Sequence, residues 1–292
     1  MRNQPLPLLI ATGIFLGLNF PIGKWALGQG VAPAVWAAFI CLCAGLAMLV
    51  VSAITAHRAH AQSPVLAYAF TSGFLSFVMP NLLTFTVIPK IGSGLAGVMF
   101  ALSPPATALL SWIFGVRPPD KWGMLGIVIG LCGAMLIVLG RGGGLDGQGG
   151  AWIFAGLLVP VFLGLGNVYR TSFWPKGAST HALAAYTNLA AVPFLLVAAI
   201  LIGGKIDLAP LFQIPVIAAL QATVSASMFL MFFRLQQIGG PTYLSQIGYV
   251  AAALGLVIGV VWFHEAYPPM VWLGAGIIAA GIAVTTIAGA KT

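Results

Sequence analysis

Residues 33–56 read PAVWAAFICLCAGLAMLVVSAITA, a stretch without a single charged side chain. A helix needs roughly 20 mostly apolar residues to cross the hydrocarbon core of a bilayer, so this stretch is long enough to do so. The whole chain continues the pattern, because 60% of its 292 residues are hydrophobic and only 5% are charged. A soluble domain carries about 25% charged residues. The sequence therefore predicts an all-α integral membrane protein.

Nine further apolar stretches, separated by glycine, proline and charged residues, resemble this one in length. The ten predicted transmembrane helices cover residues 5–27, 33–56, 64–88, 92–116, 121–140, 151–170, 181–203, 213–234, 241–263 and 269–289. Several contain prolines, among them Pro80, Pro104, Pro105 and Pro160, which free backbone carbonyls that need a polar partner or a cavity. The first stretch is too long for the core of a signal peptide, so we expect it to be the first span.

The two halves of the chain repeat each other. Phe15-Leu16-Gly17-Leu18 recurs 147 residues later as Phe162-Leu163-Gly164-Leu165, and Pro118-Pro119 recurs 150 residues later as Pro268-Pro269. We therefore expect a first five-helix repeat (1–140), a Gly-rich inter-repeat loop (141–150) and a second five-helix repeat (151–292). Because five is odd, the repeats cross the membrane in opposite senses, the inverted architecture of many secondary transporters. A parallel repeat would need one span more or fewer in each half.

The charge distribution predicts the orientation of the chain. The formal net charge of +8 comes from 12 basic against 4 acidic residues, and the basic residues lie singly between apolar runs rather than in the clusters typical of nucleic-acid binding. With the N-terminus inside, eight basic residues are cytoplasmic and four are not. The cytoplasmic eight are Arg2, Arg58, Arg117, Lys121, Arg170, Lys176, Arg234 and Lys291. This predicts a multi-pass protein of the inner (plasma) membrane, in contact with the lipid bilayer, with both termini cytoplasmic.

Signatures of enzymes, cofactors and metals are missing from the sequence. Its three cysteines lie inside apolar segments without a zinc spacing, and the acidic residues and histidines fall at predicted helix ends or in loops. Residues 141–150 contain G-x-G-x-x-G, but no strand precedes them, as a dinucleotide site requires. We expect no catalytic residue, no metal, no cofactor, no nucleic-acid partner and an interior with almost no charge.

Polar side chains within the spans predict where a small molecule binds. Amides and hydroxyls are costly in hydrocarbon, so they should face inward, where hydrogen bonding between helices explains any one of them alone. Together with nearby aromatic residues they predict a neutral cavity for a small amphipathic or zwitterionic substrate. The candidate substrate-binding residues are Asn19, Phe20, Phe77, Asn81, Ser103, Asn167, Gln221, Gln246 and Tyr249. Several G-x-x-x-G spacings allow close packing inside a monomer or in a weak homodimer.

Two segments resemble EamA-type transporters of the drug/metabolite transporter superfamily. Gly17-Leu18-Asn19-Phe20-Pro21 is similar to the opening of their first span, and His264-Glu265-Ala266-Tyr267-Pro268 is similar to the segment before the last span of each half. In the first half, Gly115 stands where that Glu would fall. The resemblance implies a carrier that works by alternating access around a central cavity, and within the family it is greatest to YddG-type exporters of aromatic amino acids. A carrier of another class, such as nucleotide-sugar-like metabolites, and a membrane receptor or scaffold are the alternatives.

Overall fold

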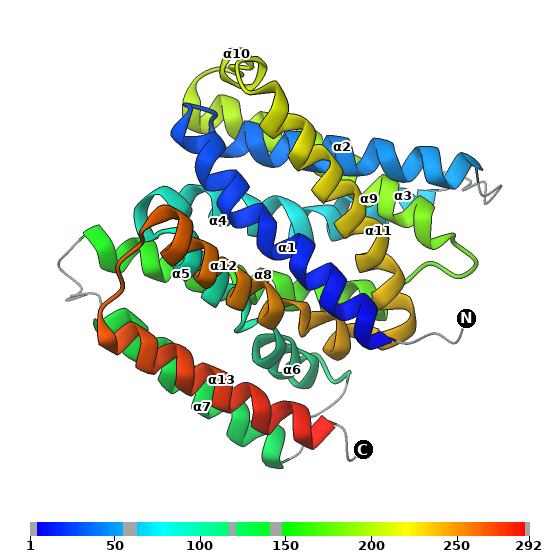
Figure 1. The fold of residues 1–292 in the computed structure, drawn as a ribbon. Helices are drawn as coiled ribbons and strands as arrows, with labels where there is room; N and C mark the ends of the chain where they lie inside the picture. The colour runs from blue at the N-terminus through cyan, green and yellow to red at the C-terminus, as the bar shows by residue number, and fades with distance from the viewer. Residues whose placement is uncertain (1–4, 55–62, 117–120, 141–147, 290–292) are drawn as a thin grey trace.

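The computed structural model describes residues 5–54, 63–116, 121–140 and 148–289, and within these ranges the chain forms helices and turns but no strand (Figure 1). The elements are α1 (Pro5–Gly28), α2 (Pro33–Ile54), α3 (Ser63–Gly73), the π-helix η1 (Phe74–Val78), α4 (Met79–Ile91), α5 (Ser93–Phe100), α6 (Ser103–Ile113), α7 (Lys121–Gly140), α8 (Gln148–Ser172), α9 (Thr180–Gly203), α10 (Ala209–Phe212), α11 (Pro215–Ser245), α12 (Ile247–Phe263) and α13 (Pro269–Gly289). The predicted inter-repeat loop lies mostly outside the described residues.

Seven helical stretches of the described chain are long and apolar enough to cross a membrane. They are Leu6–Gly28, Pro33–Ile54, Val65–Ile91, Ser93–Ile113, Gly150–Ser172, Thr180–Gly203 and Pro215–Ile238. Each coincides with one of the ten predicted spans. Helices α7, α12 and α13 cover the other three, and α12 and α13 are shorter apolar helices over their described lengths. A multi-pass helical membrane protein is thus supported, while the count of ten stays a prediction.

Two of the long stretches are interrupted where proline or a turn removes helical hydrogen bonds, and a third break separates α11 from α12. Pro80 has no backbone N–H, and directly before it the helix widens into η1, where the N–H of Met79 reaches back to the carbonyl of Phe74. The stretch of α5 and α6 breaks at Ala101-Leu102, and α6 restarts with two prolines in its first turn. The boundary between the predicted spans 213–234 and 241–263 differs from that in the structure, because α11 runs on to Ser245 and the break falls at Gln246.

Helices from the two halves of the sequence pack in pairs. Helix α2 lies along α9, α7 along α13, and α5 along α12, while α1 packs on α11 much as α4 packs on α8 (Figure 1). The α7–α13 pair is antiparallel, because Gly133 lies against Gly274 whereas Gly281 lies against Gly126 and Gly130. Glycine at these points lets the two backbones approach closely. The predicted G-x-x-x-G at Gly126 and Gly130 is therefore used within the chain.

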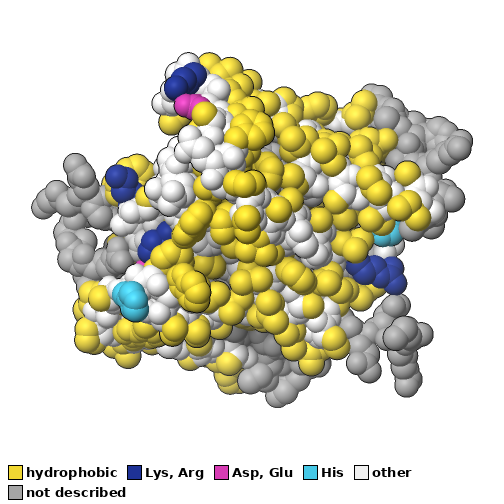
Figure 2. Space-filling model, turned by 45° about the horizontal axis from the view of Figure 1, so that its top comes forward, with side chains coloured by type: hydrophobic (Ala, Val, Ile, Leu, Met, Phe, Trp, Pro, Cys, Tyr) yellow, Lys and Arg dark blue, Asp and Glu magenta, His cyan; other side chains and the backbone are white. Residues whose placement is uncertain are grey.

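Apolar side chains cover most of the visible surface, and charged ones lie toward its margins (Figure 2). Leu201 and Ile54 are each 79% exposed, and Trp262 is 75% exposed. An exposed apolar surface of this extent is typical of a protein that interacts with a membrane or a partner. Lipid contact is the interpretation that fits the apolar spans beneath it.

Candidate functional site

A pocket opens where these three helix breaks meet. Its cavity volume is about 60 Å³, and the empty space between its walls reaches about 590 Å³ when the open mouth is included. It is lined by Leu16, Ser76, Phe77, Pro80, Asn81, Phe100, Ser103, Leu163, Asn167, Arg170, Met228, Phe229, Phe232, Leu244, Ser245, Ile247 and Gly248. These residues come from both halves of the chain and flank the π-helix, the α5–α6 break and the α11–α12 break. The interruptions thus bring side chains and loosened backbone to one place.

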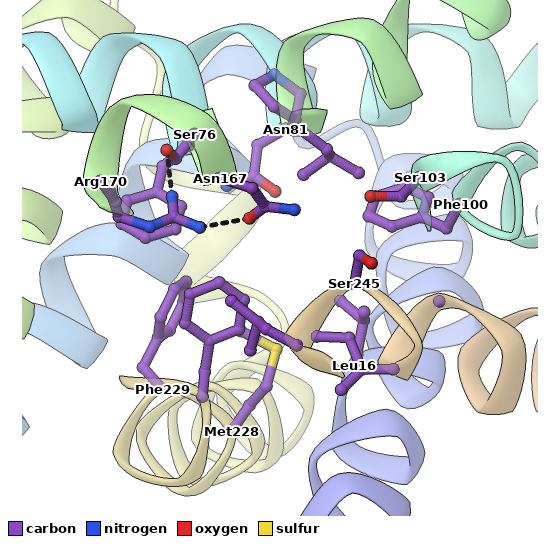
Figure 3. A pocket seen from close by; sticks show the side chains of 17 residues that line it. Leu16, Ser76, Asn81, Phe100, Ser103, Asn167, Arg170, Met228, Phe229 and Ser245 are labelled. Atoms are coloured by element: carbon purple, nitrogen blue, oxygen red, sulfur yellow. Dashed lines mark hydrogen bonds between the residues drawn. The ribbon is translucent and has the colours of Figure 1, made fainter. Parts of the chain in front are cut away.

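The walls of the pocket differ in chemistry. One wall carries Arg170 and Asn167 from the last turns of α8, with Ser76 bound to the guanidinium (Figure 3). Across the space lie Met228 and Phe229 of α11. The aromatic side is a packed cluster, because the ring centroid of Phe77 lies 4.8–6.3 Å from those of Phe229, Phe232 and Phe233, and Phe232 lies 6.0 Å from Phe229 and 5.6 Å from Phe233. A polar wall facing an aromatic wall suits an amphipathic molecule.

The interior was expected to carry almost no charge, and Arg170 was not expected to lie in it. Arg170, predicted to mark a cytoplasmic loop, is only 1% exposed and borders the pocket. Its Nε donates to Oε1 of Gln236 at 2.8 Å, and its other nitrogens donate to Oδ1 of Asn167 at 2.6 Å and to Oγ of Ser76. The physical reason for the error is that α8 runs on to Ser172, so that the Arg170 side chain packs between η1 and α11. Ionisable groups at such depth mark functional sites by default.

Four of the nine residues predicted from sequence line the pocket. Phe77 and Asn81 lie one helical turn apart on η1 and α4, Ser103 opens α6, and Asn167 lies on α8. The amide of Asn81 has a weak contact, 3.9 Å, to the sulfur of Cys41 and otherwise borders the open space. Asn167 donates to Thr107 at 3.1 Å and accepts from Arg170, so it orients the guanidinium.

The other five predicted residues lie behind the walls or beside them. Asn19 and Gln221 are buried and bonded to each other at 2.6 Å, which joins α1 to α11. Phe20 is 1% exposed and packs on Phe100, 4.9 Å between ring centroids, so it supports a lining residue from behind. Gln246 occupies the α11–α12 break between two lining residues, and Tyr249 packs on a separate apolar cluster around Val98 and Met99.

Sequence reasoning missed most of the second-half lining, including Arg170, Met228, Phe229, Phe232 and Ser245. The apolar members carry no signal that separates a pocket wall from any other buried face. For Arg170 a signal exists, since Asn167 precedes it by three residues and therefore shares its helix face. Its partners Ser76 and Gln236 are 94 and 66 residues away in sequence, so only the fold identifies them.

A second polar cluster, which we call the Glu265 cluster, consists of Lys24, Ser93, Glu265 and Tyr267. Glu265 follows α12, and its carboxylate accepts from the Ser93 N–H and hydroxyl, each at 2.8 Å, and from the Gly94 N–H at 3.0 Å. It also accepts from Lys24 and from the Tyr267 hydroxyl. The carboxylate thereby caps the N-terminus of α5, where the helix dipole favours negative charge. The cluster ties α1, α5 and the α12–α13 connection together at one end of the pocket-bearing bundle.

This cluster predicts a pH dependence of stability. Burial raises the pKa of Glu265, but the hydrogen bonds from Lys24, Tyr267 and the backbone outweigh it and hold the pKa at about 2, below the ordinary 4.5. A depressed folded-state pKa stabilises the protein above the unfolded-state pKa, and this contribution is lost as pH falls through the folded one. The Tm advantage of wild type over Glu265→Gln is therefore expected to be constant from pH 7 to about 4.5 and to vanish towards pH 2. An advantage that disappears between pH 7 and 5 would contradict this assignment.

Comparison with known proteins adds three similarities. A profile of the EamA-like transporter family matches residues 5–139. The "Uncharacterized inner membrane transporter YedA" of Escherichia coli K12 is 25% identical over 295 residues, covering 98% of this chain and 92% of that protein, and proteins of the same name from strains O6:H1 and O157:H7 match equally. A solved structure titled "Crystal structure of protein" has a TM-score of 0.67 at 18% identity over 96% of both chains. The last likeness shows the fold alone, and the first two support a membrane transporter rather than an enzyme.

Proposed function

We propose that the chain is an EamA-type carrier of the drug/metabolite transporter superfamily that exports small amphipathic metabolites, with aromatic amino acids as its substrates. The family match ends at residue 139, where the first of the two sequence repeats ends. We propose that this carrier has ten spans arranged as two inverted five-helix repeats. It is supported by the antiparallel α7–α13 pair and by the α1–α11 contact, whose counterpart in an exchange of halves is α8–α4.

The observation that carries the proposal is the pocket at the meeting point of three interrupted helices. Transporters bind substrate near the bilayer midplane, between repeats, where discontinuous helices supply backbone and polar groups. Leu16 lies near the middle of α1, and Phe100 and Ser103 lie near the middle of the Ser93–Ile113 stretch, which supports a binding site within the spans rather than at their ends. The aromatic wall of Phe77, Phe229 and Phe232 favours a substrate with a ring. A receptor or scaffold has no need of these features.

The two ends of the bundle support alternating access. In the predicted orientation, the Glu265 cluster closes the outer end and Arg170 lies toward the cytoplasm. At the position of the first repeat that corresponds to Glu265 the described chain has Gly115, and a Cβ added at Gly115 would meet nothing within 4 Å. We propose that this conformation accepts substrate from the cytoplasm and that release outward requires opening of the Glu265 cluster.

The test is efflux of labelled phenylalanine from preloaded cells with and without the protein. Wild type is expected to give saturable efflux, and Asn81→Leu to slow it about fivefold, as the loss of one hydrogen bond of roughly 1 kcal/mol implies. Asn188→Leu is the matched control, because Asn188 is buried in α9, bonded to Ala184 of its own helix, and away from the pocket. Equal membrane abundance is checked by immunoblot. Absence of wild-type efflux across the aromatic amino acids contradicts the proposed substrate class.

A further inference from the structure

Arg170 is a buried cation surrounded by neutral groups. Three of the five N–H groups of its guanidinium donate to Gln236, Asn167 and Ser76, none of which carries a formal charge. Two rings flank the cation, with the Phe232 centroid 5.1 Å and the Phe77 centroid 5.9 Å from Cζ. Hydrogen bonds and ring faces hold the guanidinium in place, but within the described part of the chain no carboxylate pairs with its positive charge.

The carboxylates of the described chain lie elsewhere. The ion pairs found there join Glu265 to Lys24 and Asp207 to Lys205. Both therefore belong to other parts of the fold, and no carboxylate of the described residues lies among the pocket lining. A buried charge in surroundings of low dielectric strongly favours an opposite charge nearby. The open space beside the guanidinium is the place where such a charge can enter (Figure 3).

We infer that Arg170 binds the carboxylate of the substrate, so that the pocket selects small aromatic carboxylates and does not require an amino group. The planar guanidinium has two N–H groups left after its three bonds, which matches the two oxygens of a carboxylate. The ring of the substrate then lies against Met228 and Phe229 across the pocket. A substrate ammonium group finds only neutral oxygens among the lining residues, such as those of Asn81, Ser103 and Ser245.

This inference rests on the proposed function and deepens it by a substrate class. It separates two ways of holding an aromatic amino acid. If Arg170 provides the main polar contact, 3-phenylpropionate, which lacks the amino group, competes about as well as phenylalanine. If the aromatic wall and the neutral amides suffice, 2-phenylethylamine, which lacks the carboxylate, competes as well as either. A purely structural Arg170, placed to bridge α8, η1 and α11, predicts no difference between the two analogues.

The experiment is phenylalanine counterflow in proteoliposomes containing purified protein. For wild type, 3-phenylpropionate is expected to inhibit within about threefold of unlabelled phenylalanine, and 2-phenylethylamine at least about tenfold more weakly. Arg170→Gln should abolish the preference for 3-phenylpropionate, and Arg170→Lys should keep it in part, because lysine retains the charge but not the planar fork. Arg234→Gln removes an exposed arginine of α11, bonded to Gln237, and should leave the preference intact.

The outcomes distinguish the inference from the proposed function. Equal inhibition by the two analogues in wild type overturns the role of Arg170, even if phenylalanine is transported. If phenylalanine is not transported, the proposed substrate is wrong, and thermal stabilisation of wild type by 3-phenylpropionate still tests the inference. If 3-phenylpropionate stabilises wild type but not Arg170→Gln, the carboxylate site is upheld. If millimolar 3-phenylpropionate does not stabilise wild type, the inference is overturned. If the Arg170 variants do not fold, the ranking of analogues on wild type decides.

Discussion

Replacing Glu265 with alanine is expected to lower the free energy of unfolding by about 3 kcal/mol, because removal of one partner of a buried pair leaves the other charge unpaired. Lys24 is 26% exposed as a side chain and Glu265 only 7%, so water compensates only part of the loss. Lys24 keeps the face of Phe263, 4.5 Å from its Nζ, as a weaker partner. The substitution also leaves the N–H groups of Ser93 and Gly94 without their acceptor. Several degrees of Tm should be lost in detergent.

The local effect of the same substitution is more specific than the loss of Tm. The backbone N–H groups of Ser93 and Gly94 donate to Glu265, and that of Leu95 donates to the Tyr267 hydroxyl at 3.3 Å. These hydrogen bonds protect the three amides from exchange with solvent. Their hydrogen exchange, measured by mass spectrometry, should rise about tenfold or more in Glu265→Ala as the start of α5 loosens. Glu265→Gln keeps one acceptor oxygen, so its exchange rate should lie between those of wild type and Glu265→Ala.

A matched control comes from the second acid–lysine pair of the described chain. Lys205 and Asp207 are 3.0 Å apart, but their side chains are 74% and 39% exposed, and such pairs contribute little. Asp207→Asn should therefore leave Tm and the exchange of residues 93–95 unchanged. If Glu265→Ala behaves like Asp207→Asn, the Glu265 cluster does not close the outer end, and the proposed gating loses its basis.

Hydropathy and repeat spacing predicted much of the fold because the solvent is lipid. A span must be helical and apolar, so residues such as 33–54 and 180–203 are fixed by length and composition alone. Breaks are less predictable. Pro80 and the pair Pro104-Pro105 indicate two of them in the sequence. No proline marks the break at Gln246, and the predicted start of the span at residue 241 therefore differs from the start of α12.

The residues of the candidate site were predictable only where their spacing in the sequence determines which helix face their side chains share. Phe77 and Asn81 share a helix face at i and i+4, and both line the pocket. Asn19 and Gln221 are equally polar and equally placed in mid-span, yet each is the other's hydrogen-bond partner across 202 residues of sequence. Arg170 was assigned to a loop because basic residues usually mark one, and only its burial between η1 and α11 reveals the exception.

Gly248→Ala is the second substitution with a large expected effect. Gly248 lies in the first turn of α12 and lines the pocket, and a Cβ added there would overlap the carbonyl oxygen of Phe100 and lie 3.0 Å from its carbonyl carbon. Both atoms are backbone, so the end of α5 must move away from α12. Overpacking of this kind costs about 1–3 kcal/mol. We expect a lower Tm together with slower phenylalanine efflux, since Phe100 itself forms part of the pocket wall.

Gly276→Ala makes the comparison decisive, because it is the same change in another helix. Gly276 of α13 is exposed, and an added Cβ would meet nothing within 4 Å. Alanine is favoured over glycine in a helix by up to about 1 kcal/mol, so this variant should be as stable as wild type or slightly more stable, with unchanged efflux. If Gly248→Ala lowers Tm while Gly276→Ala keeps or raises it, the α5–α12 contact, rather than glycine content, limits stability and shapes the pocket. Equal effects would show that α5 can retreat freely from α12 and that the pocket wall at Phe100 is not set by this contact.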